Sequence, residues 1–314
     1  MNSKNDNPLV SIIVITYNSA EYVLETLESA KAQNYDNIEL IISDDGSKDT
    51  TLDLCSRWIK ENSGRFSNTK LVTTDQNTGI PANCNTGIKN SKGEFLKIIA
   101  GDDLLLKTCI QDNLDFVSQN TERKIVISEM DAFLDGTEPK KILEHKIPYG
   151  NVFEGNSTSQ DQYNLLVHSS YFGNAPTLFY DRAVFESVQF DESLPLIEDY
   201  PFAILATKRG YKYYYLKKTT VLYRIRENSA YFKGRVELFG KFYKTKHEFD
   251  QKYRFPFLSR IPLGNEMFHY KIHEFFDSQN LNKKTPFLQL LFNGATYANP
   301  YRYLLFIQKR ILKR

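Results

Sequence analysis

The first hundred residues alternate between continuous apolar runs and segments with helical spacing. "LVSIIVITYN", Leu9–Asn18, is an unbroken run rich in β-branched residues, which is typical of a strand covered on both faces in a parallel sheet. The next segment, 19–33, has apolar residues at Val23, Leu27 and Ala30, a spacing that predicts an amphipathic helix. The chain therefore begins with a strand followed by a helix.

The same alternation continues as far as residue 100. It predicts further strands at Ile38–Ser43, Lys70–Thr74 and Phe95–Ala100, and further helices at Asp49–Lys60 and Pro81–Asn90. Repeated strand and helix units of this length favour an α/β fold whose mostly parallel sheet is flanked by helices and joined by right-handed crossovers.

The second half of the chain has a weaker pattern. From about residue 130 short apolar pieces follow one another irregularly, although 199–208 still has the pattern of a helix. Beyond "VLYRIRENSAYF" the chain becomes rich in Phe, Tyr, Lys and Arg, so we place a boundary near residue 230. We expect a large domain over 1–230 and a helical C-terminal region over 231–314.

Composition narrows the class of protein and its compartment. With 314 residues, 41% of them hydrophobic, the chain can bury one large core and a smaller appendage. The 40 basic and 38 acidic residues give a formal charge of +2, which offers no electrostatic case for binding nucleic acid. Three dispersed cysteines argue against disulfides and zinc: Cys55, Cys84 and Cys109. Neither a secretory signal nor a membrane-spanning run is present, so we expect a cytoplasmic protein.

Three predicted strands end in polar residues, at Thr16–Asn18, Ser43–Ser47 and Gly101–Asp103. Because parallel α/β sheets bind ligands at the carboxyl ends of their strands, we expect all three ends at one rim. The adjacent carboxylates of Asp102 and Asp103 disfavour each other's charge unless a cation lies beside them, and oxygen ligands select Mg²⁺, Mn²⁺ or Ca²⁺. Alternatively, the two carboxylates cap the helix that begins near Thr108.

A second acidic pair, Asp44 and Asp45, stands in "SDDGS", where Asp-Gly also favours a turn. We expect one of the two to be structural and the other to accept hydrogen bonds from a nucleobase or ribose. The chain has no GxGxxG, GxxxxGK[ST], HExxH or GxSxG motif, which disfavours dehydrogenases, P-loop NTPases, zinc proteases and α/β-hydrolases.

The order of these motifs resembles the bacterial family 2 glycosyltransferases, which have the Rossmann-like GT-A fold. The similarity runs through "VSIIVITYN", "IELIISDDGSKDTT" and "NTGIPANCNTGIKNSKGEFLKIIAGDD", and continues in "IEDYPFAILATKRGY" and "VLYRIRENS". It implies a metal-dependent, inverting enzyme that moves a sugar from a nucleotide-sugar donor, expected to be a UDP-sugar, to a hydroxyl of a glycan or lipid-linked acceptor in cell-surface polysaccharide synthesis. The alternative is a non-catalytic scaffold protein that binds sugar nucleotides with the same fold.

The resemblance also implies roles for single residues. The nucleotide and sugar of the donor would be bound at the strand ends and the next loop by Thr16, Tyr17, Asp44, Asp45, Asn77, Gly79 and Asn83. Asp103 would hold Mg²⁺ or Mn²⁺ on the donor diphosphate, and Asp102 would face ribose or sugar hydroxyls. Gly101 replaces the first acidic residue of the commonest family motif, which leaves fewer metal ligands.

Two further sites are implied in the second half. Glu198 and Asp199 match the family's acidic pair, whose aspartate is taken as the general base; alternatively, the pair is an acidic helix N-terminus favoured by the macrodipole. Arg226 stands where many relatives have a histidine and would stabilise the leaving diphosphate. Its alternative is a surface arginine whose stem packs on Tyr223.

The C-terminal stretch "NPYRYLLFIQKRILKR" mixes aromatic and aliphatic residues with basic ones. This mixture suits a helix that lies in the interface of an anionic membrane, and the stretch is too short to span one. The alternative is a terminal helix docked on the core. Contact with the inner face of the cell membrane would suit a lipid-linked acceptor.

Overall fold

The computed structural model describes residues 7–138, 140–147, 157–169, 173, 175–226, 237–240 and 242–311. Contacts within the chain define two compact units, Met1–Ile225 and Arg226–Arg314. The predicted domain boundary near residue 230 lies outside the described residues. Each unit is treated separately below.

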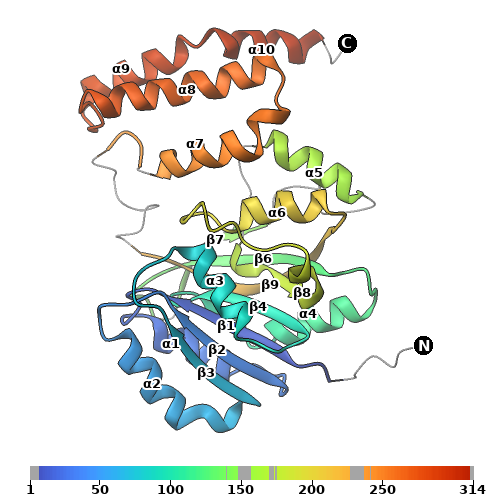
Figure 1. Ribbon diagram of the computed structural model, residues 1–314. Coiled ribbons are helices and arrows are strands. Elements are labelled where there is room, and N and C mark those ends of the chain that lie inside the picture. The colour runs from blue at the N-terminus through green and yellow to red at the C-terminus, as the bar shows by residue number, and fades with distance from the viewer. Residues whose placement is uncertain are drawn as a thin grey trace. The chain divides into compact units, whose positions relative to one another are not determined.

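The sheet of the first unit contains the four parallel strands predicted from the apolar runs (Figure 1). β1 (Val10–Thr16) lies between β2 (Ile38–Asp44) and β4 (Phe95–Ala100), and β3 (Asn68–Thr73) pairs with β2. The helices that follow these strands are α1 (Val23–Lys31), α2 (Thr51–Asn62), α3 (Ile80–Lys89) and α4 (Cys109–Ser118). The predicted α/β arrangement is confirmed for this half of the sheet.

Both faces of β1 are buried, which explains its unbroken apolar run. Because side chains alternate between the two faces of a strand, Ile12 and Val14 share one core with Val23 of α1. Ile13 points to the opposite face, where a Cβ added to Gly87 of α3 would lie 2.4 Å from its side chain. Glycine at this position therefore lets α3 pack directly on the sheet.

The remaining strands make the sheet mixed, with the order β3-β2-β1-β4-β8-β6-β9-β5 and β7 beside β6. β8 runs antiparallel to β4 and β6, and β6 runs parallel to β9. The bounds are β5 Leu104–Leu105, β6 Ile125–Leu134, β7 Lys141–Lys146, β8 Phe179–Asp181 and β9 Tyr213–Ile225. Among the described residues of the first unit, 3₁₀ helices lie at Ser63–Arg65, Ala175–Thr177 and Arg182–Glu186.

Two more helices lie in the described part of the first unit. α5 (Ser159–His168) starts with a capping box made by Thr158 and Asp161. α6 (Asp199–Lys208) has the bounds predicted from the sequence. The Tyr200 hydroxyl donates a hydrogen bond of 2.9 Å to the carbonyl oxygen of Leu166, which joins α6 to α5.

The second unit is helical, as predicted for the C-terminal region. It contains α7 (Phe242–Tyr253), α8 (Arg260–Ser278), α9 (Pro286–Tyr297), α10 (Pro300–Ile311) and a 3₁₀ turn at Phe255–Phe257. Its core is aromatic, with Phe239, Tyr243, Tyr270 and Phe276 buried together. Within the described ranges, no helix combines the length and apolarity needed to cross a membrane.

Candidate active site

The predicted donor residues gather at the carboxyl edge of the parallel strands. Thr16, at the end of β1, donates its hydroxyl to Oδ2 of Asp44 at 2.9 Å. Asp44 Oδ1 also accepts from the Ser47 N–H at 2.9 Å and from the Thr73 hydroxyl at 3.2 Å. Asp44 is buried. Through these hydrogen bonds its carboxylate joins the ends of β1, β2 and β3 to the turn after β2.

Asp45 holds the loop that leads into α3. Its Oδ1 accepts from the Thr78 N–H at 2.8 Å and from the Thr78 hydroxyl at 2.7 Å, and its Oδ2 accepts from the Gly79 N–H at 2.8 Å. Thr74 adds a hydroxyl donor at 3.2 Å, and Asn77 Oδ1 accepts from the Gly79 N–H at 3.1 Å. Asp45 is also buried, and its contact with a nucleotide stays a prediction.

The first turn of α3 and the loop before it lie against β1 and the segment before α6. Asn83 Nδ2 donates to the carbonyl oxygen of Thr16 at 3.2 Å. Gly79 has a φ of 99°, and a Cβ there would lie 2.7 Å from Pro195. The Ile80 N–H donates to the Pro195 carbonyl oxygen at 2.9 Å. The predicted donor wall is thus joined to the segment that carries the predicted base, and Tyr17 is exposed at its rim.

Glu198 and Asp199 line a pocket of about 70 Å³ together with the carboxyl ends of β1 and β4. The other walls are mostly apolar and come from Ile15, Cys84, Ile98, Ile99, Ala100, Ala175, Pro176, Leu178, Tyr180 and Phe190. The structure therefore brings the predicted base to the same sheet edge as the predicted donor residues.

The surroundings of this pair disfavour negative charge. Burial raises the pKa of Asp199 to about 7, although its Oδ1 accepts from the Tyr200 N–H at 2.8 Å. Burial, and then repulsion from Asp199, raise the pKa of Glu198 to about 8. Glu198 is the N-cap residue of α6 but its side chain makes no capping hydrogen bond, so an ordinary helix cap does not account for it.

α6 packs against a cluster of aromatic side chains that was not predicted from the sequence. The ring of Phe202 lies 5.4 Å from Tyr180, 5.2 Å from Phe185 and 4.8 Å from Phe190, measured between centroids. Such close aromatic contacts hold the first turn of α6 in place. Asp199 therefore has a rigid support.

Asp102 and Asp103 form a turn after β4 and do not cap α4, whose N-cap residue is Thr108. The helix-cap alternative is therefore wrong. A Cβ on Gly101 would lie 2.8 Å from Cγ2 of Thr16, so the end of β1 leaves no room for an acidic side chain at that position. Asp103 is buried and its Oδ1 accepts from the Arg224 N–H at 2.9 Å, whereas Asp102 is partly exposed.

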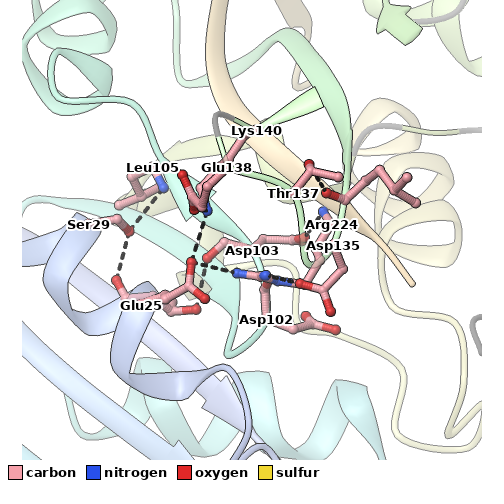
Figure 2. A network of polar contacts seen from close by, with 12 residues as sticks. Glu25, Ser29, Asp102, Asp103, Leu105, Asp135, Thr137, Glu138, Lys140 and Arg224 are labelled. Carbon is pink, nitrogen blue, oxygen red and sulfur yellow. Dashed lines mark hydrogen bonds and ion pairs between the residues drawn. The ribbon is translucent and has the colours of Figure 1, made fainter. Parts of the chain in front are cut away.

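Arg224, which the sequence reasoning overlooked, organises this turn. Figure 2 shows its guanidinium between Glu25 and Asp135, with Asp102 and Asp103 beside it. Its Nη2 lies 3.2 Å from Oε2 of Glu25, and its Nη1 lies 2.5 Å from Oδ1 of Asp135. Its Nε donates to the Asp102 carbonyl oxygen at 2.7 Å. The signal was an arginine inside the apolar run "VLYRI", because a buried arginine requires carboxylate partners.

The carboxylates after β4 suit a hard divalent cation. They offer oxygen ligands only, and no group of three or more His, Cys, Asp or Glu side chains in the described parts of the chain could hold a metal by itself. Mg²⁺ and similar ions are commonly held by one or two carboxylates plus substrate phosphates. Asp102 and Asp103 therefore fit a cation that takes its other ligands from a bound diphosphate. Arg226 follows β9 directly, and its role stays a prediction.

An α/β sheet with polar and acidic side chains at its parallel strand ends, and a carboxyl pair in the adjoining pocket, has the arrangement at which α/β sheets bind ligands. The profile of "Glycosyl transferase family 2" matches residues 11–188, more than half of the chain. The chain therefore belongs to glycosyl transferase family 2, a family of enzymes. The predicted resemblance is confirmed.

Curated relatives agree with this membership. The chain is 24% identical over 232 residues to the minor teichoic acid biosynthesis protein GgaB of Bacillus subtilis, which covers 73% of the chain and 24% of GgaB. It is 30% identical over 203 residues to an uncharacterized glycosyltransferase of Rickettsia typhi, with 64% and 59% covered. The matched region thus spans less than two thirds of either relative.

Solved structures agree on the fold. S. aureus TarS 1-349 in complex with UDP-GlcNAc gives a TM-score of 0.57 at 22% identity, covering 76% of this chain and 64% of that one. The mannosyltransferase PcManGT of Pyrobaculum calidifontis, in complex with GDP-Man and Mn²⁺, gives 0.51 at 18% identity, covering 94% and 72%. The predicted GT-A type of fold is confirmed.

Proposed function

We propose that the protein catalyses an inverting transfer of a sugar from a UDP-sugar to a hydroxyl of a glycan or lipid-linked acceptor in cell-surface polysaccharide synthesis. The observation that carries the proposal is the pocket shared by Asp199 and the strand ends that hold the predicted donor residues. The UDP-GlcNAc complex of TarS supports a uridine nucleotide, and the teichoic acid role in the name of GgaB supports a cell-surface polymer.

Asp199 is the proposed general base. Its pKa of about 7 leaves a substantial fraction ionised at neutral pH, while its basicity is far above that of an ordinary aspartate. It would accept the proton of the acceptor hydroxyl as the oxygen attacks the anomeric carbon from the face opposite the diphosphate. The bond to the diphosphate breaks and the configuration at that carbon inverts. Glu198, whose pKa burial raises above its ordinary value, would help to orient the acceptor.

The donor would be held along the carboxyl edge. Thr16, Tyr17 and Asp45 are proposed to contact the nucleotide, with Asp44 fixing the strand ends and Asn77, Gly79 and Asn83 forming the wall beside ribose and sugar. Asp103 would hold Mg²⁺ or Mn²⁺ against the diphosphate, with Asp102 directed to ribose or sugar hydroxyls. When bound, the cation would neutralise charge on the departing diphosphate. Arg226 would add a second positive charge there.

Slow hydrolysis of a nucleotide sugar would distinguish an enzyme from a scaffold protein that only binds nucleotide sugars. We expect purified protein to release UDP from a UDP-sugar in the presence of Mn²⁺, because water can replace the acceptor. The release of UDP is measured with a panel of UDP- and GDP-sugars. Binding of a nucleotide sugar, detected as a rise in melting temperature, without any release would favour the scaffold.

A further inference from the structure

Large hydrophobic side chains on α9 and α10 are exposed. They form the α9–α10 face, which comprises Phe287, Leu290, Leu291, Tyr297, Tyr303, Leu304, Phe306 and Ile307, each at least 44% exposed. No residue of α9 is buried. Single exposed hydrophobic residues are ordinary on a protein surface, but a contiguous group is typical of an interaction site.

Both helices pack on α8 with the side opposite to this face. From α9, the Phe292 ring lies 5.3 Å from Phe276 and 5.5 Å from His273. From α10, the Tyr301 ring approaches Gly264 so closely that a Cβ there would lie 2.3 Å away. The side of α10 that carries Tyr301 is therefore docked on α8, as the alternative of a docked terminal helix predicts, and the other side of α10 is exposed.

The spacing of the exposed residues makes one continuous surface. In α9, positions 287, 290, 291 and 297 follow helical spacing along one side, and positions 303, 306 and 307 do so in α10. The two helices meet through the Tyr303 hydroxyl, which donates to the Tyr297 carbonyl oxygen at 3.1 Å. The exposed sides thus continue from one helix into the next.

Charged residues are distributed unevenly between the C-terminal segment 278–314, which contains α9 and α10, and the rest of the chain. Residues 278–314 contain seven of the 40 basic residues and none of the 38 acidic ones. The preceding 277 residues are therefore net acidic, although the whole chain is close to neutral. On the face itself, Arg302 and Arg310 are exposed, and their guanidinium groups lie 4.7 Å from the ring centroids of Tyr297 and Phe306.

This charge decides between possible occupants. A second copy of the chain would bring two equally basic surfaces together, which repulsion opposes. An anionic bilayer offers phosphate groups to the arginines and an apolar layer to the aromatic and aliphatic side chains. We propose that the α9–α10 face binds the surface of a membrane that contains anionic lipids.

Co-sedimentation with lipid vesicles tests the proposal on the full chain. We expect binding to vesicles of phosphatidylcholine mixed with phosphatidylglycerol, and at least about tenfold weaker binding to phosphatidylcholine alone. Added salt should weaken the binding because it screens the basic side chains. Since neither donor nor acceptor is needed, failure of this test would leave the sugar-transfer proposal intact.

Two double variants separate the apolar and the electrostatic contributions. Leu290→Ser with Phe306→Ser removes exposed apolar groups, and Arg302→Ser with Arg310→Ser removes exposed charges; each should weaken binding about tenfold or more. The matched controls lie in the first unit: Ile142→Ser, which is 48% exposed on β7, and Arg57→Ser with Lys60→Ser on α2. The controls should bind like the parent.

Circular dichroism melting shows whether each variant folds, and the exposure of the replaced residues predicts parental melting curves. The proposal is overturned if the folded parent binds neither kind of vesicle, or if both double variants bind like the parent. A parent that is dimeric in sedimentation velocity, ignores vesicles and becomes monomeric in the Leu290→Ser and Phe306→Ser variant would identify a second copy as the occupant instead.

Discussion

Two acidic pairs in the first unit have the same chemistry and opposite surroundings. Asp44 and Asp45 are buried among hydroxyl and backbone N–H donors supplied by the strand ends and the loop before α3. Glu198 and Asp199 line a mostly apolar pocket, where burial raises both of their pKa values. The first pair stabilises a rim, and the second pair keeps its capacity to accept a proton.

The comparison teaches that an acidic motif does not reveal its role by itself. A carboxylate whose oxygens are occupied by protein donors holds the chain together. A carboxyl group in an apolar pocket has few compensating donors, so its proton affinity rises into the range that suits general base catalysis. The number of hydrogen-bond donors around each carboxyl group therefore distinguishes a structural role from a catalytic one.

The largest expected effect is that of Asp199→Asn. Sugar transfer should fall by roughly 10²–10⁴-fold because an amide cannot accept the acceptor's proton. Binding of UDP with Mn²⁺ should stay within about twofold of the parent, since the base faces the acceptor. Transfer is measured as UDP release and binding by titration calorimetry.

Glu198→Gln is the matched control for that variant, because it changes the neighbouring carboxyl group in the same pocket. It should retain more activity than Asp199→Asn, since the aspartate, and not the glutamate, is the proposed base. If Glu198→Gln is the more damaging change, the base has been assigned to the wrong member of the pair.

Asp45→Ala should break the other side of the comparison by destabilising the fold. Removal of the carboxylate leaves the N–H groups of Thr78 and Gly79 without their acceptor, which should cost about 2–4 kcal/mol of unfolding free energy. Urea unfolding at pH 8 measures this loss.

Asp199→Asn should behave differently in the same unfolding measurement. The folded-state pKa of Asp199 is raised, so its favourable contribution to the unfolding free energy is lost as the pH rises through about 7. At pH 8 a neutral amide at this position should therefore not destabilise the protein. Equal losses in Asp45→Ala and Asp199→Asn would remove the distinction between the two pairs.

A smaller effect is expected at the turn after β4. Asp103→Asn should weaken the Mn²⁺-dependent binding of UDP by about tenfold or more, because one carboxylate ligand of a hard cation is lost. Binding measured without metal should change little. Asp102→Asn is the control, and a larger loss of Mn²⁺-dependent binding in that variant would transfer the metal ligand to the exposed neighbour.

The parallel half of the sheet was predictable because each of its strands is buried on both faces. The continuous run over β1 and the helical spacing of α1 are direct consequences of that burial. The mixed half was not predictable, since β8 has three residues and β9 pairs with β6 across register shifts. Short or irregular strands leave little periodicity in the sequence.

The candidate site was predictable in its residue types but not in its contacts. Asp199 could be placed at a helix start, but its pocket also depends on Ile15, Cys84 and Ile98, which come far earlier in the sequence and belong to other elements. Arg224 was not predicted, because the sequence pattern does not distinguish it from Arg226 two residues later. Which of the two arginines is buried depends on Glu25 and Asp135, and no local pattern encodes that meeting.

The pH dependence of kcat/KM shows whether Asp199 is the group that accepts the proton, because its pKa is raised by burial. The rate of transfer should rise with pH through an apparent pKa near 7, since only ionised Asp199 accepts a proton. Glu198→Gln should keep this rise, because that variant leaves the proposed base in place. A profile that is flat from pH 5 to pH 8 in the parent, or a rise near pH 7 that persists in the residual activity of Asp199→Asn, would contradict the assignment.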